Sequence, residues 1–141
     1  MYQTRSRADE ALLNTIYQIA SRGYCMTSVL AEKATGHLKA LLVRRADEYQ
    51  QVEEEAMEGL RRLGYEPEAE ESTRDVIGSL AYITSDADVA GAMIRGGADG
   101  MTSLRGTLNA SRDAAAQIQT LAARTIQEEQ RNIERMKAFL G

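Results

Sequence analysis

The chain has 141 residues, a formal net charge of −4 and an apolar fraction of 43%, which together fit one globular domain over residues 1–141. Aromatic residues make up only 5% of the sequence, and this scarcity argues against all-β folds. Cys25 is the single cysteine, which excludes an internal disulfide framework and a multi-cysteine zinc site. We therefore expect an all-α protein of the reducing cytoplasm.

Neither a membrane nor a nucleic acid is expected as a partner. No stretch of sequence reaches the roughly 18 to 20 uncharged apolar residues that span a bilayer, and the amino terminus lacks the apolar core of a signal peptide. Residues 47–75 carry 11 acidic and three basic side chains, whereas phosphate binding needs a concentrated basic face.

Apolar residues at spacings of three and four predict a first helix over about residues 7–34. Ser6 and Asp9 form a serine-x-x-acid signature, which satisfies free amides at a helix start. Gly36 is expected to stop the helix, because a residue without Cβ enters the left-handed conformation easily. Two adjoining apolar stripes along this helix suit the interior of a bundle.

A second helix is predicted over about residues 37–63, with its leucines facing inward and its run of glutamates in solvent. Gly64 is expected to cap this helix, and Pro67 prevents its continuation. A polar, acidic segment follows, which the pattern predicts to be a connection rather than a helix.

A short helix over about residues 75–83 and a third long helix over about residues 86–108 are predicted next. The serine-x-x-acid signature recurs before both, at Ser72 and at Ser85. A fourth long helix is predicted to follow, over about residues 112–139.

Ser111 is the expected cap of that fourth helix. Helices 1 and 2, like helices 3 and 4, are joined by only a few residues and must therefore be antiparallel neighbours. Residues 64–85, in contrast, are long enough to run back along a whole bundle. This order of connections predicts a four-helix bundle with one long crossover, between helices 2 and 3, that contains the short helix.

Four segments carry a likeness to a known family. They are residues 37–42 (HLKALL), 61–67 (RRLGYEP), 86–96 (DADVAGAMIRG) and 128–136 (EEQRNIERM). Over nearly its whole length the chain resembles the ferritin-like superfamily, and most of all its small bacterial members that lack the di-iron ligands. The resemblance implies the same bundle with one crossover.

Metal-binding members of that superfamily use a glutamate on each of two helices and Glu-x-x-His on each of the other two. This chain has one histidine, His37, at the start of its helix, and the nearest counterparts of the motif are Glu48 with Gln51 and Glu129 with Asn132. We therefore predict no bound metal and no other cofactor. The last four residues form a weak alternative site for magnesium, calcium or manganese, which prefer oxygen ligands.

A simpler interpretation of Glu48 and Glu129 is pairing with Arg45 or Arg131, or exposure to solvent. Cys25 is expected to be a small residue of the core or its boundary, because no second histidine is present to activate it as a nucleophile. No catalytic residue is predicted.

Helix 3 carries small residues at Ala92, Gly96 and Gly100, with Gly97 beside them. Glycine inside a helix costs about 1 kcal/mol relative to alanine, so this run predicts a close approach of another backbone or side chain. The approaching group is either helix 1 or the same helix of a second subunit.

Three functions remain open at this stage. The leading hypothesis is a non-catalytic binding or interaction module that self-associates, with a dimer favoured. The second is a metal-binding or oxidoreductase protein that uses the atypical site of carboxylates and amides. The third is a carrier of a small apolar ligand, in a cavity bordered by glycines and by the tyrosines Tyr17, Tyr24, Tyr49 and Tyr82.

Overall fold

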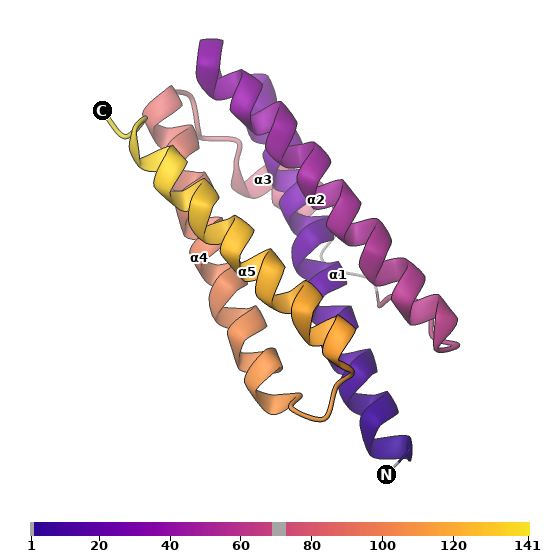
Figure 1. Cartoon of the computed structure of the whole chain (residues 1–141). Helices are drawn as coiled ribbons and strands as arrows, with labels where there is room; N and C mark the ends of the chain where they lie inside the picture. Colours follow the sequence, from indigo (N-terminus) through magenta and orange to yellow (C-terminus); the bar gives the residue numbers. More distant parts are fainter. Residues whose placement is uncertain (1, 69–72) are drawn as a thin grey trace.

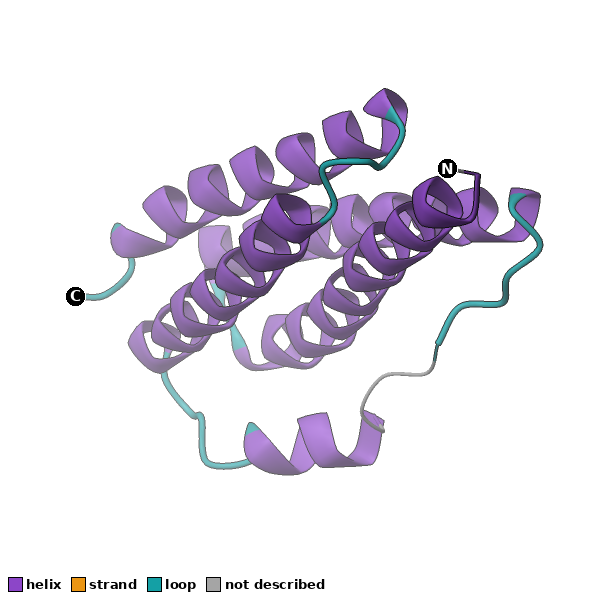
Figure 2. Cartoon of the chain, turned by 90° about the horizontal axis from the view of Figure 1, so that it is seen from below, coloured by secondary structure: helices purple, strands orange, loops and turns teal. Residues whose placement is uncertain are grey.

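The computed structural model describes residues 2–68 and 73–141, and their regular structure is entirely helical. The elements in chain order are α1 (Tyr2–Lys33), α2 (Gly36–Arg62), α3 (Thr73–Ser79), α4 (Asp86–Ala110) and α5 (Ala116–Lys137). The four long helices lie side by side, and α3 lies outside them (Figure 1, Figure 2). The prediction of an all-α chain is confirmed. Within the described ranges, no helix combines the length and apolar character needed to cross a membrane.

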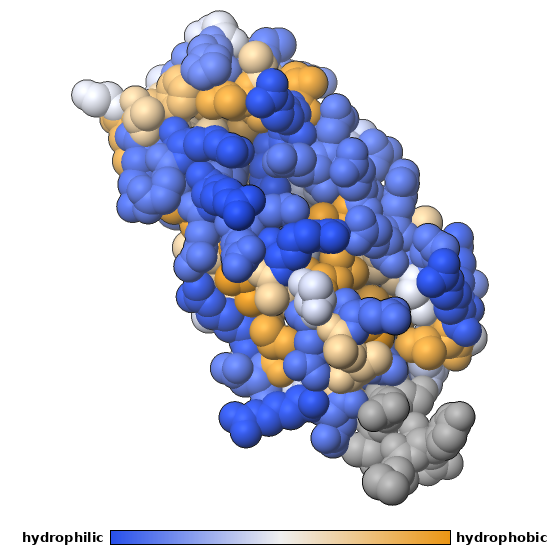
Figure 3. All heavy atoms as spheres, in the orientation of Figure 1, coloured by the Kyte–Doolittle hydropathy of each residue, from blue (hydrophilic) through white to orange (hydrophobic). Residues whose placement is uncertain are grey.

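α1 is the helix around which the others assemble. It packs along α2, its antiparallel neighbour, and it also contacts α3, α4 and α5. α4 and α5 form a second antiparallel pair. The face of the molecule on the side of α2 and α5 is mostly hydrophilic, as expected if the apolar stripes of the helices face inward (Figure 3).

The apolar core consists of two clusters at opposite ends of the bundle. The first cluster includes Leu30, Leu42, Ile83, Val89 and Met136. The second cluster includes Leu12, Ile16, Leu60, Leu104 and Ile126. On α1, α2, α4 and α5 alike, the residues between these two sets lie in the middle of the helix. That middle layer contains buried polar side chains, and it is where the candidate site lies.

The end of α2 confirms the predicted glycine cap. Gly64 has a φ of +87°, which is the left-handed conformation that glycine adopts without strain. Its amide donates to the carbonyl of Arg61 at 3.0 Å, and the amide of Tyr65 donates to that of Leu60 at 2.9 Å. These two bonds satisfy carbonyls that the helix leaves without partners.

The start of α4 confirms the predicted serine cap. The Ser85 hydroxyl oxygen accepts a hydrogen bond from the Asp88 amide at 3.1 Å. The carboxylate of Asp86 accepts two further bonds, from the Thr35 amide at 3.1 Å and the Thr35 hydroxyl at 2.7 Å. The turn between α1 and α2 is thereby tied to the beginning of α4.

The connection between α2 and α4 runs past α1. The Glu68 amide donates to the buried Asn14 side chain of α1 at 3.1 Å. The predicted capping residue Ser72, like Glu70 and Glu71 of the acidic segment, lies outside the described residues.

The short helix α3 ends at Ser79, whereas the sequence predicted its continuation to residue 83. The amides of Leu80 and Ile83 each donate to the carbonyl three residues before them, so the chain forms tight turns here. These turns bury both side chains in the first apolar cluster, and that burial explains why the helix stops.

The start of α5 also differs from the prediction. α5 begins at Ala116 rather than at residue 112, and Ser111 is buried in the preceding turn instead of capping the helix. The cap comes from α1: the Asp9 carboxylate accepts the Ala115 amide at 2.7 Å. Because α1 begins at Tyr2, Asp9 lies inside that helix and is available for this distant contact.

Candidate functional site

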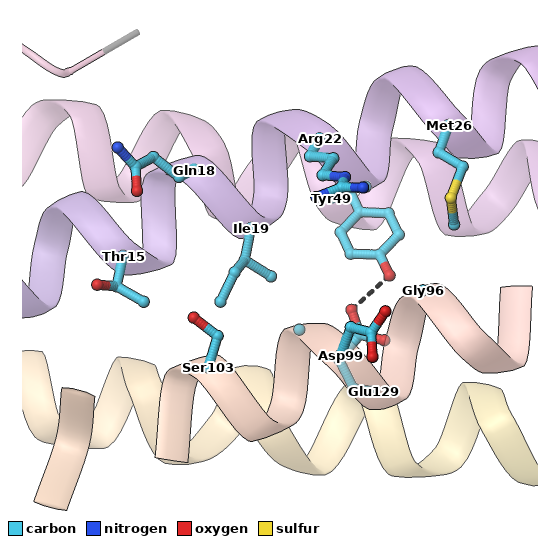
Figure 4. Close-up of a pocket in the computed structure, with 12 residues that line it drawn as sticks. Thr15, Gln18, Ile19, Arg22, Met26, Tyr49, Gly96, Asp99, Ser103 and Glu129 are labelled. Atoms are coloured by element: carbon cyan, nitrogen blue, oxygen red, sulfur yellow. Dashed lines mark hydrogen bonds between the residues drawn. The ribbon is translucent and has the colours of Figure 1, made fainter. Parts of the chain in front are cut away.

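Three buried side chains from α2 and α5 form a polar cluster in the middle layer of the bundle. Arg45 and Tyr49 lie four residues apart on α2 and therefore share a helix face. Arg45 Nη2 lies 3.0 Å from Glu129 Oε1. The Tyr49 hydroxyl donates a hydrogen bond to the same oxygen (Figure 4). The exposed fractions are 3% for Arg45, 4% for Tyr49 and 2% for Glu129. We call these three residues the central cluster.

Two further carboxylates surround the Arg45 guanidinium. Glu48 Oε1 lies 3.2 Å from Arg45 Nη1, and Glu128 Oε2 lies 3.9 Å from it. The guanidinium group also lies over the Tyr49 ring, 4.0 Å from its centroid. The Arg45 guanidinium therefore faces three carboxylates, of which Glu128 also lies 3.7 Å from Arg124 Nε.

The electrostatic state of the central cluster follows from its burial. Burial raises the pKa of the Glu129 carboxyl, although Arg45 and the Tyr49 hydrogen bond oppose the rise. Burial, together with the charge of Glu129, also raises the pKa of Tyr49, so its hydroxyl keeps its proton. Burial alone would lower the pKa of Arg45, but the charge of Glu129 and the hydrogen bonds that the guanidinium donates to Tyr49 and Glu48 raise it instead.

Three buried polar atoms of this layer have no hydrogen-bond partner within the described residues. They are Arg45 Nε, Glu129 Oε2 and Asn132 Nδ2. Buried polar atoms in proteins are nearly always paired, with protein, water or a bound group. These atoms therefore mark the middle layer as a place with unused hydrogen-bonding capacity.

A cavity of about 200 Å³ lies between α1 and α4 and reaches the central cluster (Figure 4). Its lining residues are Thr15, Gln18, Ile19, Arg22, Gly23, Met26, Tyr49, Gly96, Asp99, Gly100, Ser103 and Glu129. Arg22, Asp99 and Ser103 are exposed, whereas Tyr49 and Glu129 are buried. The cavity thus runs inward from a charged rim at the surface to the Glu129 carboxylate.

Glycines bring the helices close together around the cavity. A Cβ on Gly97 would lie 2.8 Å from Glu129 Oε2, and one on Gly23 would lie 2.5 Å from the Tyr49 ring. The Glu129 and Tyr49 side chains therefore occupy space that a Cβ at either glycine would fill. Because Gly23 of α1 and Gly97 of α4 have no Cβ, there is room between the helices for the central cluster.

The other small residues of the predicted run also lie against this chain's own side chains. A Cβ on Gly100 would lie 3.3 Å from Ile19 Cγ2, and one on Gly96 would collide with the Met26 side chain of α1. Ala92, the fourth small residue, is buried in the first apolar cluster. Contacts within one subunit therefore account for the spacing of these residues without a second copy of the chain.

The four residues of the alternative cation site differ in their surroundings. Glu129 and Asn132 are buried in the middle layer, and Gln51 is exposed on α2. The Glu48 side chain, which is 37% exposed, pairs with Arg45. Among the residues that the structure describes, no group of three or more histidine, cysteine, aspartate or glutamate side chains has the arrangement of a metal site. Arg45 pairs with both Glu48 and Glu129, and pairing with Arg45 is one of the simpler roles that the sequence suggested for these two glutamates.

The other candidate residues lie away from the cavity. His37 is exposed, with its ring centroid 6.0 Å from that of Phe139. Cys25 is half-buried against the first apolar cluster. Of the four tyrosines considered for a cavity wall, only Tyr49 is among the described lining residues. Tyr17 packs against the second apolar cluster, and Tyr24 and Tyr82 are at least one third exposed.

Arg45 is the site residue that sequence reasoning did not single out as a buried group. It occupies an inward position of α2 between Leu42 and Tyr49, where the apolar stripe is interrupted. A charged residue at such a position signals a buried partner on a neighbouring helix. Comparison with models of protein families, with curated proteins and with solved structures finds no significant match to the chain.

Proposed function

We propose that this protein is a non-catalytic binding module whose cavity between α1 and α4 holds a small organic molecule. The observation that carries the proposal is the cavity of about 200 Å³ that leads from the surface to the buried Glu129 carboxylate, of which Oε2 has no partner among the described residues. Ligand sites are typically concave and largely apolar, with a few polar groups that fix the orientation of the ligand. Ile19 and Met26 supply the apolar wall, and the central cluster supplies the polar end.

We further propose that the bundle is of the ferritin-like kind. The order of short, long and short connections supports this assignment, as does the position of the short α3 within the long connection. The buried polar layer, halfway along the helices, supports it as well, because members that hold metal do so in the bundle core. In this chain the positive charge of that layer is the Arg45 guanidinium, which contacts Glu48, Glu128 and Glu129.

Binding is favoured over catalysis by the way Glu129 is held. Its Oε1 interacts with both Arg45 and Tyr49, so the carboxylate is fixed in place and its charge is partly neutralised. A general acid or base must exchange its proton with a substrate, whereas a fixed carboxylate is suited to orienting a bound molecule. Self-association is a separate expectation, which sedimentation velocity tests directly.

A thermal-shift screen of small organic molecules tests the proposal. A ligand that binds only the folded state at 100 times its Kd adds about 2.7 kcal/mol, which is visible as a raised Tm. We expect fragments of the size of benzene to raise the Tm of the wild type, and Ser103→Leu, which places a larger side chain at the exposed mouth of the cavity, to abolish the effect. Thr102→Leu is the matched control, because Thr102 is exposed on the same helix but does not line the cavity.

Two results would contradict this function. One is the absence of any fragment that stabilises the wild-type protein. The other is an equal Tm increase in the wild type and in Ser103→Leu, which would place binding elsewhere. The same melts, repeated with iron or manganese, test the metal-binding alternative: we expect no metal-dependent rise in Tm, and a rise that Glu129→Ala abolishes would favour a metal site.

A further inference from the structure

We infer that the cavity selects a small organic ammonium ion, with its apolar body against Ile19 and Met26 and its N–H groups directed to the Glu129 carboxylate. The inference rests on the proposed function and names the chemical class of the ligand for the same site. Four features of the cavity carry it: hydrogen-bonding capacity, charge, size and the apolar wall.

Hydrogen-bonding capacity at the inner end of the cavity is that of an acceptor. The Tyr49 hydroxyl already donates its proton to Glu129 Oε1, so only its lone pairs remain available to a ligand. Glu129 Oε2 has no partner within the described residues, and a carboxylate oxygen can only accept. A ligand that reaches this end must therefore donate, and an ammonium group has three donors and no acceptor.

Charge in and around the cavity favours a cation. Among the described residues that line the cavity, Glu129 and Asp99 are acidic and Arg22 alone is basic (Figure 4). The guanidinium of Arg45, behind Glu129, is shared with Glu48 and Glu128, so it does not leave the inner end positive. An anionic ligand would have to approach the buried carboxylate through a region of low dielectric constant, where repulsion between like charges is strong.

Size limits the ligand to a compact molecule. The cavity of about 200 Å³ is below the range of roughly 300 to 1,000 Å³ that holds drug-sized ligands. It exceeds the roughly 150 Å³ that is known to hold benzene in an engineered protein cavity. Ile19 and Met26 offer this body an apolar wall, and Gly100 leaves space beside it. Benzylammonium fits these requirements and serves as the probe.

The experiment compares three molecules of nearly equal shape that differ in charge: benzylammonium, benzyl alcohol and benzoate. Each is titrated into the wild-type protein at pH 7.5, with calorimetry for the affinity and amide NMR for the place of binding. Because a hydrogen bond to a charged group is stronger than a neutral one, we expect benzylammonium to bind about tenfold more tightly than benzyl alcohol, which corresponds to about 1.4 kcal/mol. Benzoate should bind most weakly. The amide resonances of Gly96 and Gly100 should shift on binding.

Two glutamate variants locate the origin of the preference. Glu129→Gln keeps an oxygen that can accept from Tyr49, and we expect it to remove the tenfold preference for benzylammonium. Glu134→Gln removes an equal charge from the same helix, at an exposed position that pairs with Lys137 and does not line the cavity. It should keep the preference. The comparison of the three probes on the wild type needs neither variant, so it decides the matter even if Glu129→Gln does not fold.

The failure of this inference differs from the failure of the proposed function. Binding of benzyl alcohol or benzoate as tightly as benzylammonium would overturn the ammonium preference, and so would a preference that persists in Glu129→Gln. Either result leaves the cavity as a ligand site. If none of the three molecules binds but other fragments raise the Tm, the ammonium preference is again wrong. The absence of binding by every molecule tested would overturn both.

Discussion

Arg45 of α2 and Glu129 of α5 form an ion pair 3.0 Å apart in the buried middle layer of the bundle. The pair is buried, in contrast to the exposed contact of Arg124 with Glu55 between the same two helices, and it also fixes the carboxylate at the inner end of the cavity. Removal of two charges from water is costly, and their attraction offsets that cost only while both partners are present. The stability of the bundle should therefore depend on the pair as a unit.

Replacement of Arg45 alone should be strongly destabilising. We expect Arg45→Met to lower the free energy of unfolding by about 3 to 5 kcal/mol, because it leaves Glu129 buried without its counter-ion. The double variant Arg45→Met/Glu129→Gln should recover most of this loss. Arg44→Met is the control, since Arg44 is exposed, and it should change stability by less than about 0.5 kcal/mol. Urea melts measure all three, and an equal loss at positions 44 and 45 would contradict the buried pair.

The pH dependence of stability should carry the signature of Glu129. Burial raises its pKa in the folded protein, so the folded state holds this proton at a higher pH than the unfolded chain does. The stabilisation from that proton is present at acidic pH and is lost as the pH rises through the folded-state pKa. The wild type should therefore lose stability relative to Glu129→Gln, which does not titrate, as the pH rises from about 4.3, the ordinary pKa of glutamate, through the folded-state pKa. Urea melts of both proteins across this range test the sign, and a gain in relative stability would show that Arg45 outweighs burial.

Two glycines of α4 should respond in opposite ways to alanine. A Cβ on Gly97 would lie 2.8 Å from Glu129 Oε2, so Gly97→Ala should destabilise the protein by about 1 to 3 kcal/mol through overpacking. Apart from the neighbouring backbone of α4 itself, no atom of the described residues lies within 4 Å of a Cβ on Gly106. Gly106→Ala should therefore stabilise the protein by about 0.5 to 1 kcal/mol, the usual gain of alanine in a helix. Thermal melts of the two variants decide this. A gain at both positions would mean that the close packing around Glu129 is absent.

Asp9 of α1 should stabilise the start of α5, although the two are more than a hundred residues apart in the sequence. Its carboxylate accepts the Ala115 amide at the start of α5, and loss of a capping group costs about 0.5 to 2 kcal/mol. We expect Asp9→Ala to fall in that range and to increase hydrogen exchange in the first turn of α5. Asp113→Ala, at an exposed aspartate close to that turn, is the control and should have little effect. Equal effects of the two substitutions would rule out the cap.

Local signals allowed the sequence to predict much of the fold. Gly64 and Ser85 act through bonds to residues three to five positions away, so their capping roles can be read from short motifs. The start of α5 could not be predicted in this way, because its cap is Asp9 of α1. The sequence around α5 contains no information about that distant contact. α3 likewise ends where Leu80 turns into the core rather than at a local signal.

The candidate site was predicted only in part, for a related reason. Glu48 and Glu129 both lie near the edge of an apolar stripe, so the helical pattern does not indicate which of the two is buried. In the folded protein Glu129 is 2% exposed and the Glu48 side chain 37%, because Arg45 and Tyr49 of α2 reach across to α5 at the level of Glu129. Burial here depends on which helices face each other, and periodicity along a single helix does not contain that information.

A crystal structure of the protein grown with benzylammonium tests the central claim most directly, because it shows the cavity, the central cluster and the ligand together. The account predicts density for the ligand between α1 and α4, with its nitrogen within hydrogen-bond distance of the Glu129 carboxylate and its ring against Ile19 and Met26. A cavity closed by its own side chains would contradict the account, as would a Glu129 side chain turned out of the middle layer.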